Sequence, residues 1–412
     1  MSPSKKFKLV LLLGMLTAVG PFSIDMYLPS FPGIAASLHT SVARITLSLS
    51  SFFVGIAFGQ MFYGPLLDKF GRKKPLYLGL MVYIIASLGC ALAANSEQLI
   101  WLRLLQALGS CSGLVAARAM VRDLFPVEDN AKVFSSLMLV VGVSPLIAPT
   151  LGGYFTAAFG WHSIFLFLAF MCLCILIGVH YLLPDSYKPD PNFSLKPSYI
   201  LNGYKNVIKE PQFYIYCFTG SIAAAGLYAY IAGSPAVFME LFNVSEKQYG
   251  WIFAFVAAGL ITSSQINSFL LRKYKSQQVI KIALIFQSLA GLSLFVGSFL
   301  GILNVFGTIA LCLIFLSCQG FIFPNTTALS LSPFTKTAGS ASALLGSIQM
   351  AIGAFSSAMV SFFNNGTALP MTGVMALCAI ISLLVLLRGN NSLISKAYPK
   401  IKSCEIDEIP AL

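Results

Sequence analysis

The chain contains twelve long apolar runs, each close to the roughly 20 residues that an α-helix needs to cross a bilayer. The hydrocarbon core offers no partner for an unpaired backbone amide, so such runs are restricted to helices, which satisfy their own hydrogen bonds. The sequence therefore predicts an all-α polytopic membrane protein. The expected spans are 8–28, 43–66, 75–94, 98–119, 132–157, 162–183, 211–239, 248–271, 278–299, 303–330, 337–363 and 367–388.

Composition supports this class. With 57% hydrophobic and 10% charged residues, the 412-residue chain is far from a soluble domain, in which about a quarter of the residues are charged. A net charge of +12 could indicate a nucleic-acid partner, but the cations gather in loops between the runs, so we expect none. Most of the nine cysteines lie in apolar runs without metal-ligand spacing. No disulfide, metal or cofactor is expected.

The segment GPLLDKFGRKK, residues 64–74, places five charges between two apolar runs and so predicts a turn in water. Short loops rich in Lys and Arg stay in the cytoplasm. Counting spans from this turn puts both termini, and nearly all of the 26 Lys and Arg residues, on the cytoplasmic side. The charged start and first apolar run imitate a signal peptide, but we interpret them as an uncleaved first span of an inner-membrane protein.

The longest interior loop divides the spans six and six. We expect a six-helix bundle over 1–184, a cytoplasmic linker with an amphipathic helix over 185–210, a second bundle over 211–389 and a tail over 390–412. Two such halves are typical of transporters whose substrate site lies at mid-membrane between them. We therefore expect a monomer that carries a small molecule. No enzymatic pattern is evident.

Two charged residues lie inside apolar runs, Asp25 in PFSIDMYLP and Arg103 in WLRLLQALG. An intramembrane charge costs at least about 2.5–3.5 kcal/mol by insertion scales and therefore indicates function. Both are expected about one turn from the outer end of their spans, so they are candidate partners. A buried carboxylate of this kind can take up and release protons. The alternatives are that Asp25 caps its span in interfacial water and that Arg103 snorkels to the interface.

Charged residues also recur at the cytoplasmic ends of spans 2 and 4. We predict a charge network of Asp68, Arg72 and Asp123 that acts as a latch on the inner side; the alternative is a solvated helix end. The residues assigned to this cytoplasmic gate are Gly64, Asp68, Gly71, Arg72, Arg118, Arg122 and Asp123.

Span 5 reads GVSPLIAPTLGG and predicts a bent, closely packed helix. Proline removes a backbone hydrogen bond, and glycine lets a neighbouring helix approach. The residues concerned are Gly142, Pro145, Pro149, Gly152 and Gly153.

Polar and aromatic side chains within the spans are candidates for a substrate cavity, in which aromatic faces hold flat or cationic ligands. The alternative is interhelical hydrogen bonding, worth about 0.6 kcal/mol on average. The candidates are Tyr27, Gln60, Gln106, Tyr216, Tyr228, Tyr230, Ser234, Gln265, Asn267, Asn325 and Gln349.

Several of these stretches resemble the major facilitator superfamily. GPLLDKFGRKK resembles its signature between spans 2 and 3, RLLQALGSCSG its span 4 motif, and GVSPLIAPTLGG its antiporter motif in span 5. Together with SIDMYLP, ARAMVRDLF, SPAVF (234–238), FPN (323–325) and AGSASALLG (338–346), they are similar to the Bcr/CflA, or bicyclomycin-resistance, branch of drug:proton antiporters.

This resemblance implies that Asp25 carries the proton and that Arg103 is its coupling partner. Some related antiporters have a second acidic residue two turns earlier, where this chain has Thr17. One proton per cycle is therefore the simpler expectation. The expected function is proton-coupled export of drugs or related metabolites by alternating access. The alternatives are a metabolite uptake symporter on the same fold and a non-transporting receptor or scaffold.

Overall fold

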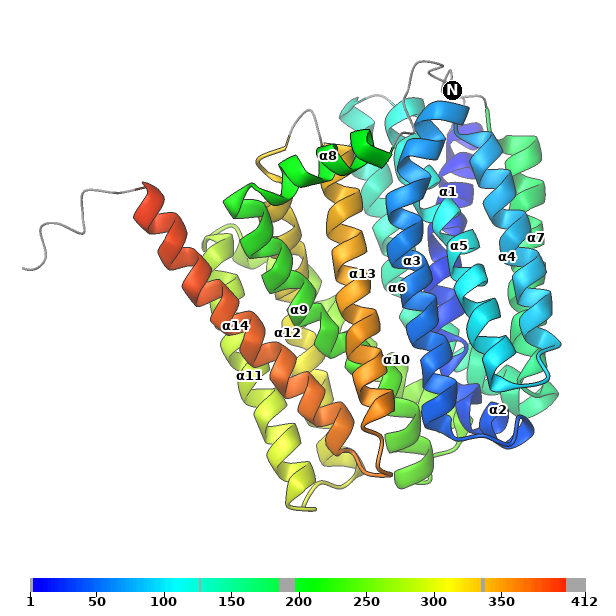
Figure 1. The fold of residues 1–412 in the computed structure, drawn as a ribbon, viewed down its shortest axis with the longest axis vertical. Helices are drawn as coiled ribbons and strands as arrows, with labels where there is room; N and C mark the ends of the chain where they lie inside the picture. The colour runs from blue at the N-terminus through cyan, green and yellow to red at the C-terminus, as the bar shows by residue number, and fades with distance from the viewer. Residues whose placement is uncertain (1–2, 126, 185–196, 335–337, 398–412) are drawn as a thin grey trace, which may run out of the picture.

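The computed structural model describes residues 3–125, 127–184, 197–334 and 338–397. Within these ranges all regular elements are helical, and twelve helices are long and apolar enough to cross a membrane (Figure 1). The predicted fold class is confirmed. The first six spanning helices are α1 (Pro3–Asp25), α3 (Val42–Phe70), α4 (Lys73–Ala91), α5 (Ser96–Leu124), α6 (Val127–Phe159) and α7 (His162–Leu182).

A 3₁₀ turn (Leu28–Ser30) and the short α2 (Phe31–Ser37) link α1 to α3. The amphipathic helix expected in the linker forms as α8 (Pro197–Ile208). A six-residue π-helix, Ala236–Leu241, continues the first helix of the second half. The spanning helices of that half are α9 (Pro211–Pro235), α10 (Glu246–Leu270), α11 (Ser276–Phe299), α12 (Val305–Leu331), α13 (Ala338–Phe362) and α14 (Leu369–Ala397).

The fourth spanning helix of each half starts in the same way. The Asn95 side-chain oxygen accepts from the amide of Gln98 at the start of α5, and Asn304 accepts from the amide of Gly307 at the start of α12. An Asn at this position satisfies one of the amides that a helix leaves unpaired at its N-terminus. The two halves therefore begin their fourth helix with the same local chemistry, although they share little visible sequence.

Most helix ends lie within a few residues of the predicted spans, and the differences have physical causes. α1 ends at Asp25 rather than at residue 28, because the chain turns before Pro29, which has no amide to donate. α14 continues to Ala397, into the segment predicted as a tail. A helix continues wherever backbone bonding allows, whereas hydropathy marks only its lipid-facing part.

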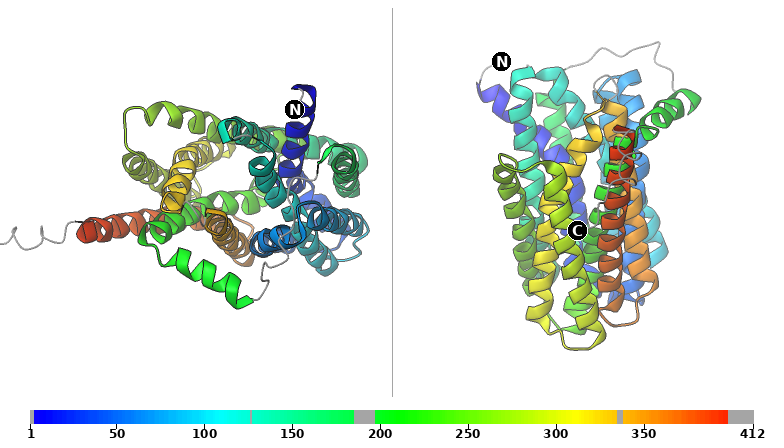
Figure 2. Two further views of the ribbon diagram at one scale, coloured as in Figure 1. Left: turned by 90° about the horizontal axis from the view of Figure 1, so that it is seen from above. Right: turned by 90° about the vertical axis from the view of Figure 1, so that its left-hand side faces the viewer.

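The two halves meet along a seam, defined here as the packing of α3 on α13 and of α6 on α10. One contiguous cluster of buried apolar residues extends from α1 to α14 and crosses this seam. We call the end of the bundle that carries Arg72 and α8 the basic end; α2, Asn95 and Asn304 lie at the opposite end (Figures 1 and 2).

Candidate functional site

Asp25 is the last residue of α1 and lies at the seam. It is 5% exposed, and among the described residues it is the acidic side chain that falls in the buried class. It has no hydrogen bond or ion pair with any described residue. It lies within electrostatic range of the hydroxyls of Tyr228 on α9 and Tyr249 on α10, both from the second half. The carboxylate therefore faces the other half of the molecule.

Arg103 is fully buried inside the first half. Its Nη2 donates to the backbone oxygen of Ser23 at 2.9 Å, and its Nη1 donates to the side-chain oxygen of Gln106. The guanidinium carbon lies 4.5 Å from the ring centroid of Tyr27 and 4.2 Å from that of Phe52. Cation–π contacts of this kind gain strength where water is excluded. They help to hold this arginine away from solvent, where it pairs with no described carboxylate and its Nε has no described hydrogen-bond partner.

Arg103 on α5 thus contacts the helix that carries Asp25 but does not pair with Asp25 itself. The Ser23 hydroxyl lies 2.6 Å from the hydroxyl of Tyr83 on α4, so this face of α1 points into the first half. Two residues further along a helix the side chain has turned by about 200°. Asp25 consequently points out of that half. The expected side-by-side pairing does not form, because equal depth along two helices does not determine which way each helix is rotated.

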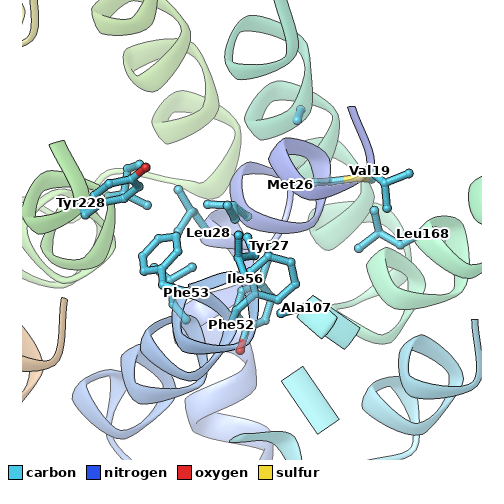
Figure 3. Close-up of a cluster of buried hydrophobic side chains, with 14 of the residues drawn as sticks. Val19, Met26, Tyr27, Leu28, Phe52, Phe53, Ile56, Ala107, Leu168 and Tyr228 are labelled. Carbon is cyan, nitrogen blue, oxygen red and sulfur yellow. The ribbon is translucent and has the colours of Figure 1, made fainter. Parts of the chain in front are cut away.

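Beside Asp25, aromatic residues from both halves meet. The Phe53 ring of α3 lies 4.8 Å from the Tyr228 ring of α9, edge to face, and Figure 3 shows the two approaching each other beside Leu28. The Tyr228 ring also lies against Gly353 of α13, where an added Cβ would come within 2.5 Å of it. Tyr228 therefore touches both α3 and α13, one of the two helix pairs that form the seam.

At the basic end the predicted charge network is present. Arg72 Nη1 donates to Asp68 Oδ1 and its Nε to Asp123 Oδ2, both at 2.7 Å. Burial would lower the pKa of Arg72, but the hydrogen bonds that Arg72 donates to the carboxylates of Asp123 and Asp68 outweigh this effect, and the pKa is raised. All three residues belong to the first half. The network therefore orders the turn between α3 and α4 and does not by itself join the halves.

The other residues assigned to this gate have different environments. Gly71 has φ +81°, a backbone conformation that favours glycine. Gly64 does not require glycine for space, because a Cβ added there would meet no atom within 4 Å. Arg118 is exposed and pairs with no described residue. The side chain of Arg122 lies outside the described part of the structure.

The Gly- and Pro-rich segment of α6 packs closely on both halves at the opposite end. A Cβ on Gly152 would collide with the backbone oxygen of Met26 in the same half, and one on Gly153 would lie 2.5 Å from the backbone oxygen of Glu246 in the second half. α6 continues as one helix through Pro145 and Pro149. Gly142 has open space around its Cβ position, so the close packing predicted for all three glycines holds for two.

The predicted cavity residues lie in both halves of the structure and at the seam. Tyr27 and Gln106 bond within the first half, to Ser48 and to Arg103 and Ser87. In the second half Ser234 bonds Tyr249, Asn325 bonds Asn267, and Tyr216 and Tyr230 pack in the core. For these residues the structure shows contacts of the kind named as the alternative, bonding and packing between helices. Gln60 and Tyr228 lie at the seam, Gln349 is half-buried and Gln265 is exposed.

Sequence analysis identified Tyr27 and Tyr228 beside the two buried charges but not Phe52, Phe53 and Tyr249. Phe52 and Phe53 are adjacent in one apolar run and Tyr249 lies in the first turn of α10, where each reads as ordinary core. The available signal was the Phe-Phe pair itself, since neighbouring residues on a helix point in different directions. Here Phe52 faces Arg103 and Phe53 faces Tyr228.

Comparison with known proteins identifies the family. Residues 13–358 match the model of the Major Facilitator Superfamily. The chain belongs to this superfamily. It is accordingly a multi-pass transporter and not an enzyme.

Relatives and solved structures agree with this assignment. The bicyclomycin resistance protein homolog of Haemophilus influenzae is 32% identical, covering 92% of this chain and 95% of its own length. Multidrug resistance protein MdtL of Escherichia coli is 30% identical, covering 89% and 92%. A bacterial homolog of the lysosomal transporter Spinster, inward-facing and occupied, gives a TM-score of 0.72 at 13% identity with full coverage of both chains. The D-xylose-proton symporter gives 0.71 at 13% identity, covering 92% and 97%.

Proposed function

We propose that this superfamily member is a proton-coupled antiporter that exports small organic molecules, drugs or related metabolites, from the cytoplasm across the inner membrane. The observation that carries the proposal is Asp25, a buried carboxylate that faces the second half across the seam and forms an ion pair with no described residue. Buried ionisable groups in transporters commonly serve as proton relays. The names of the two relatives, which refer to drug resistance, support the export direction.

In this cycle the proton and the substrate compete for one position, at and beside Asp25. When the cavity opens to the cytoplasm, an organic molecule binds beside Asp25 and Tyr228, and the proton leaves Asp25. The halves then rock, separating Gly153 of α6 from the backbone of Glu246 at the start of α10. Protonation from outside displaces the substrate and resets the carrier. Arg103 holds the end of α1 through the Ser23 carbonyl and so couples the position of Asp25 to α5.

Energy comes from the proton gradient, with about 2.3 kcal/mol per charge for each 100 mV of membrane potential. One carboxylate at the seam corresponds to one proton per cycle. The protein works as a monomer, and the positive-inside distribution of Lys and Arg places both termini and the basic end in the cytoplasm.

The alternative function with a specific observation in its favour is uptake by symport, because the chain shares its fold with the D-xylose-proton symporter. At 13% identity this likeness extends to the fold alone. Direction of coupling separates the two: in symport, proton and substrate move the same way, whereas in antiport they exchange.

Inverted vesicles with an acidic interior test the proposal, using ligands first selected by thermal-shift screening of drugs and metabolites on the purified protein. An antiporter accumulates ligand and releases protons when ligand is added. Asp25→Asn is expected to insert normally and to lose gradient-driven accumulation. Glu240→Gln is the matched control, because Glu240 is an exposed acid on the π-helix after α9. Uphill export by Asp25→Asn would reject the proton role. Ligand binding without flux in the wild type would indicate a receptor or scaffold.

A further inference from the structure

A groove of about 320 Å³ lies between α4 and α7 on the outside of the first half, remote from the seam. This volume is within the range of small-molecule sites, about 300–1,000 Å³. Three apolar side chains form its floor and three polar aromatic ones its rim. The residues are Met81, Leu176 and Ile177, and Tyr77, His180 and Tyr181.

The position of these residues along their helices sets the depth of the groove. α4 begins and α7 ends at the basic end, and the two helices pack side by side (Figure 1). Tyr77 is in the second turn of α4, and His180 and Tyr181 are in the last turn of α7. The rim therefore lies where the bilayer meets water, a level at which Tyr is enriched. Met81 and Ile177 lie about one turn deeper, at the level of hydrocarbon.

The groove opens toward lipid and not toward the transport path. Ile85 of α4 and Phe170 of α7, which continue the same two helices deeper into the bilayer, are 63% and 64% exposed. Large apolar side chains with that exposure on a membrane-spanning bundle contact acyl chains. A lipid is consequently the molecule that reaches the groove from the side.

Charge selects among lipids. Lys74 is exposed and lies one turn from Tyr77 on the same face of α4, above the rim. Lys69 and Lys73 lie where α3 ends and α4 begins. The nearby carboxylates of Asp68 and Asp123 both pair with Arg72. The entrance is therefore positive, which favours an anionic headgroup by about 1 kcal/mol for each Lys near the surface.

We infer that this groove binds an anionic phospholipid of the leaflet at the basic end. One acyl chain lies along Met81 and Ile177. The headgroup phosphate contacts Lys74, with Tyr77 and His180 as hydrogen-bonding partners at the rim. The inference concerns a surface separate from Asp25 and does not depend on the direction or coupling of transport.

Native mass spectrometry of the full chain, purified with equal amounts of phosphatidylglycerol and phosphatidylcholine, tests this inference. Lys74→Gln is expected to reduce retained phosphatidylglycerol about fivefold and to leave phosphatidylcholine unchanged. Ile177→Trp fills the floor and is expected to reduce both lipids.

Two controls match these variants. Lys205→Gln removes an exposed lysine from α8, and Phe170→Trp enlarges a lipid-facing residue of α7 outside the groove. Both are expected to retain lipid as the wild type does. Equal retention of phosphatidylglycerol in all five proteins would overturn the inference. So would equal losses in the controls, or a Lys74→Gln variant that loses both lipids alike.

Discussion

Arg103 and Asp25 act on opposite sides of α1: Arg103 donates to the backbone oxygen of Ser23 from within the first half, whereas Asp25 faces Tyr228 in the second. The two charges are therefore connected through a helix end and not through an ion pair. A movement of α5 can reach Asp25 by shifting this end of α1. Four further predictions follow from such contacts.

Arg103→Lys keeps the charge but loses the planar group that bonds Ser23 and Gln106 and lies over Tyr27. Hydrogen bonds to charged groups contribute about 1.5–3 kcal/mol each, and Lys does not reproduce the fork of Arg. We expect a lower thermal midpoint in detergent and loss of coupled transport. Arg44→Lys, on an exposed part of α3, is the control. Wild-type coupling in Arg103→Lys would show that charge alone suffices.

Gly153→Ala places a methyl group against the backbone of Glu246 in the second half and is expected to weaken closure at the opposite end. Gly142→Ala, eleven residues earlier in the same helix, meets open space. Cysteine labelling from the outer side should increase for Gly153→Ala and remain unchanged for Gly142→Ala, while transport falls in the first variant alone. Equal labelling of both variants would contradict the assignment of this contact as a gate.

Gly71→Ala forces a side chain into a backbone conformation with φ +81° at the α3–α4 turn. Such strain costs on the order of 1–3 kcal/mol. Gly64→Ala, in the interior of α3 with no atom near its Cβ, is expected to be neutral or slightly stabilising because alanine favours helices by about 1 kcal/mol over glycine. Thermal unfolding of the two variants measures the difference. A stable Gly71→Ala would indicate that the turn adapts.

Asp123→Asn is expected to impair the protein more than Asp68→Asn. Both acids accept from Arg72 at 2.7 Å, but the Asp123 side chain is 16% exposed and that of Asp68 is 42% exposed. Exposed ion pairs contribute about 0–1 kcal/mol, whereas removing one partner of a buried pair costs about 3–5 kcal/mol. Thermal midpoints and transport rates of both variants test this order. The reverse order would mean that Asp68 serves gating and not local structure.

Much of this architecture was predictable from the sequence, because the bilayer allows a long apolar run few alternatives to a helix. The twelve spans, the charged turn of Asp68 and Arg72, and the burial of charges at Asp25 and Arg103 all depend on composition along one helix or between neighbours. The network with Asp123 was predictable for the same reason, since all three residues lie at one end of the bundle.

Only the tertiary structure decided how the helices are rotated about their axes. It directs Asp25 toward Tyr228 and encloses Arg103 between Tyr27 and Phe52, neither of which follows from their place in apolar runs of the sequence. It also separates Gly152, which touches Met26, from Gly142, which touches nothing. Depth follows from hydropathy along one chain segment, but rotation depends on the shapes of side chains that meet from helices far apart in the sequence.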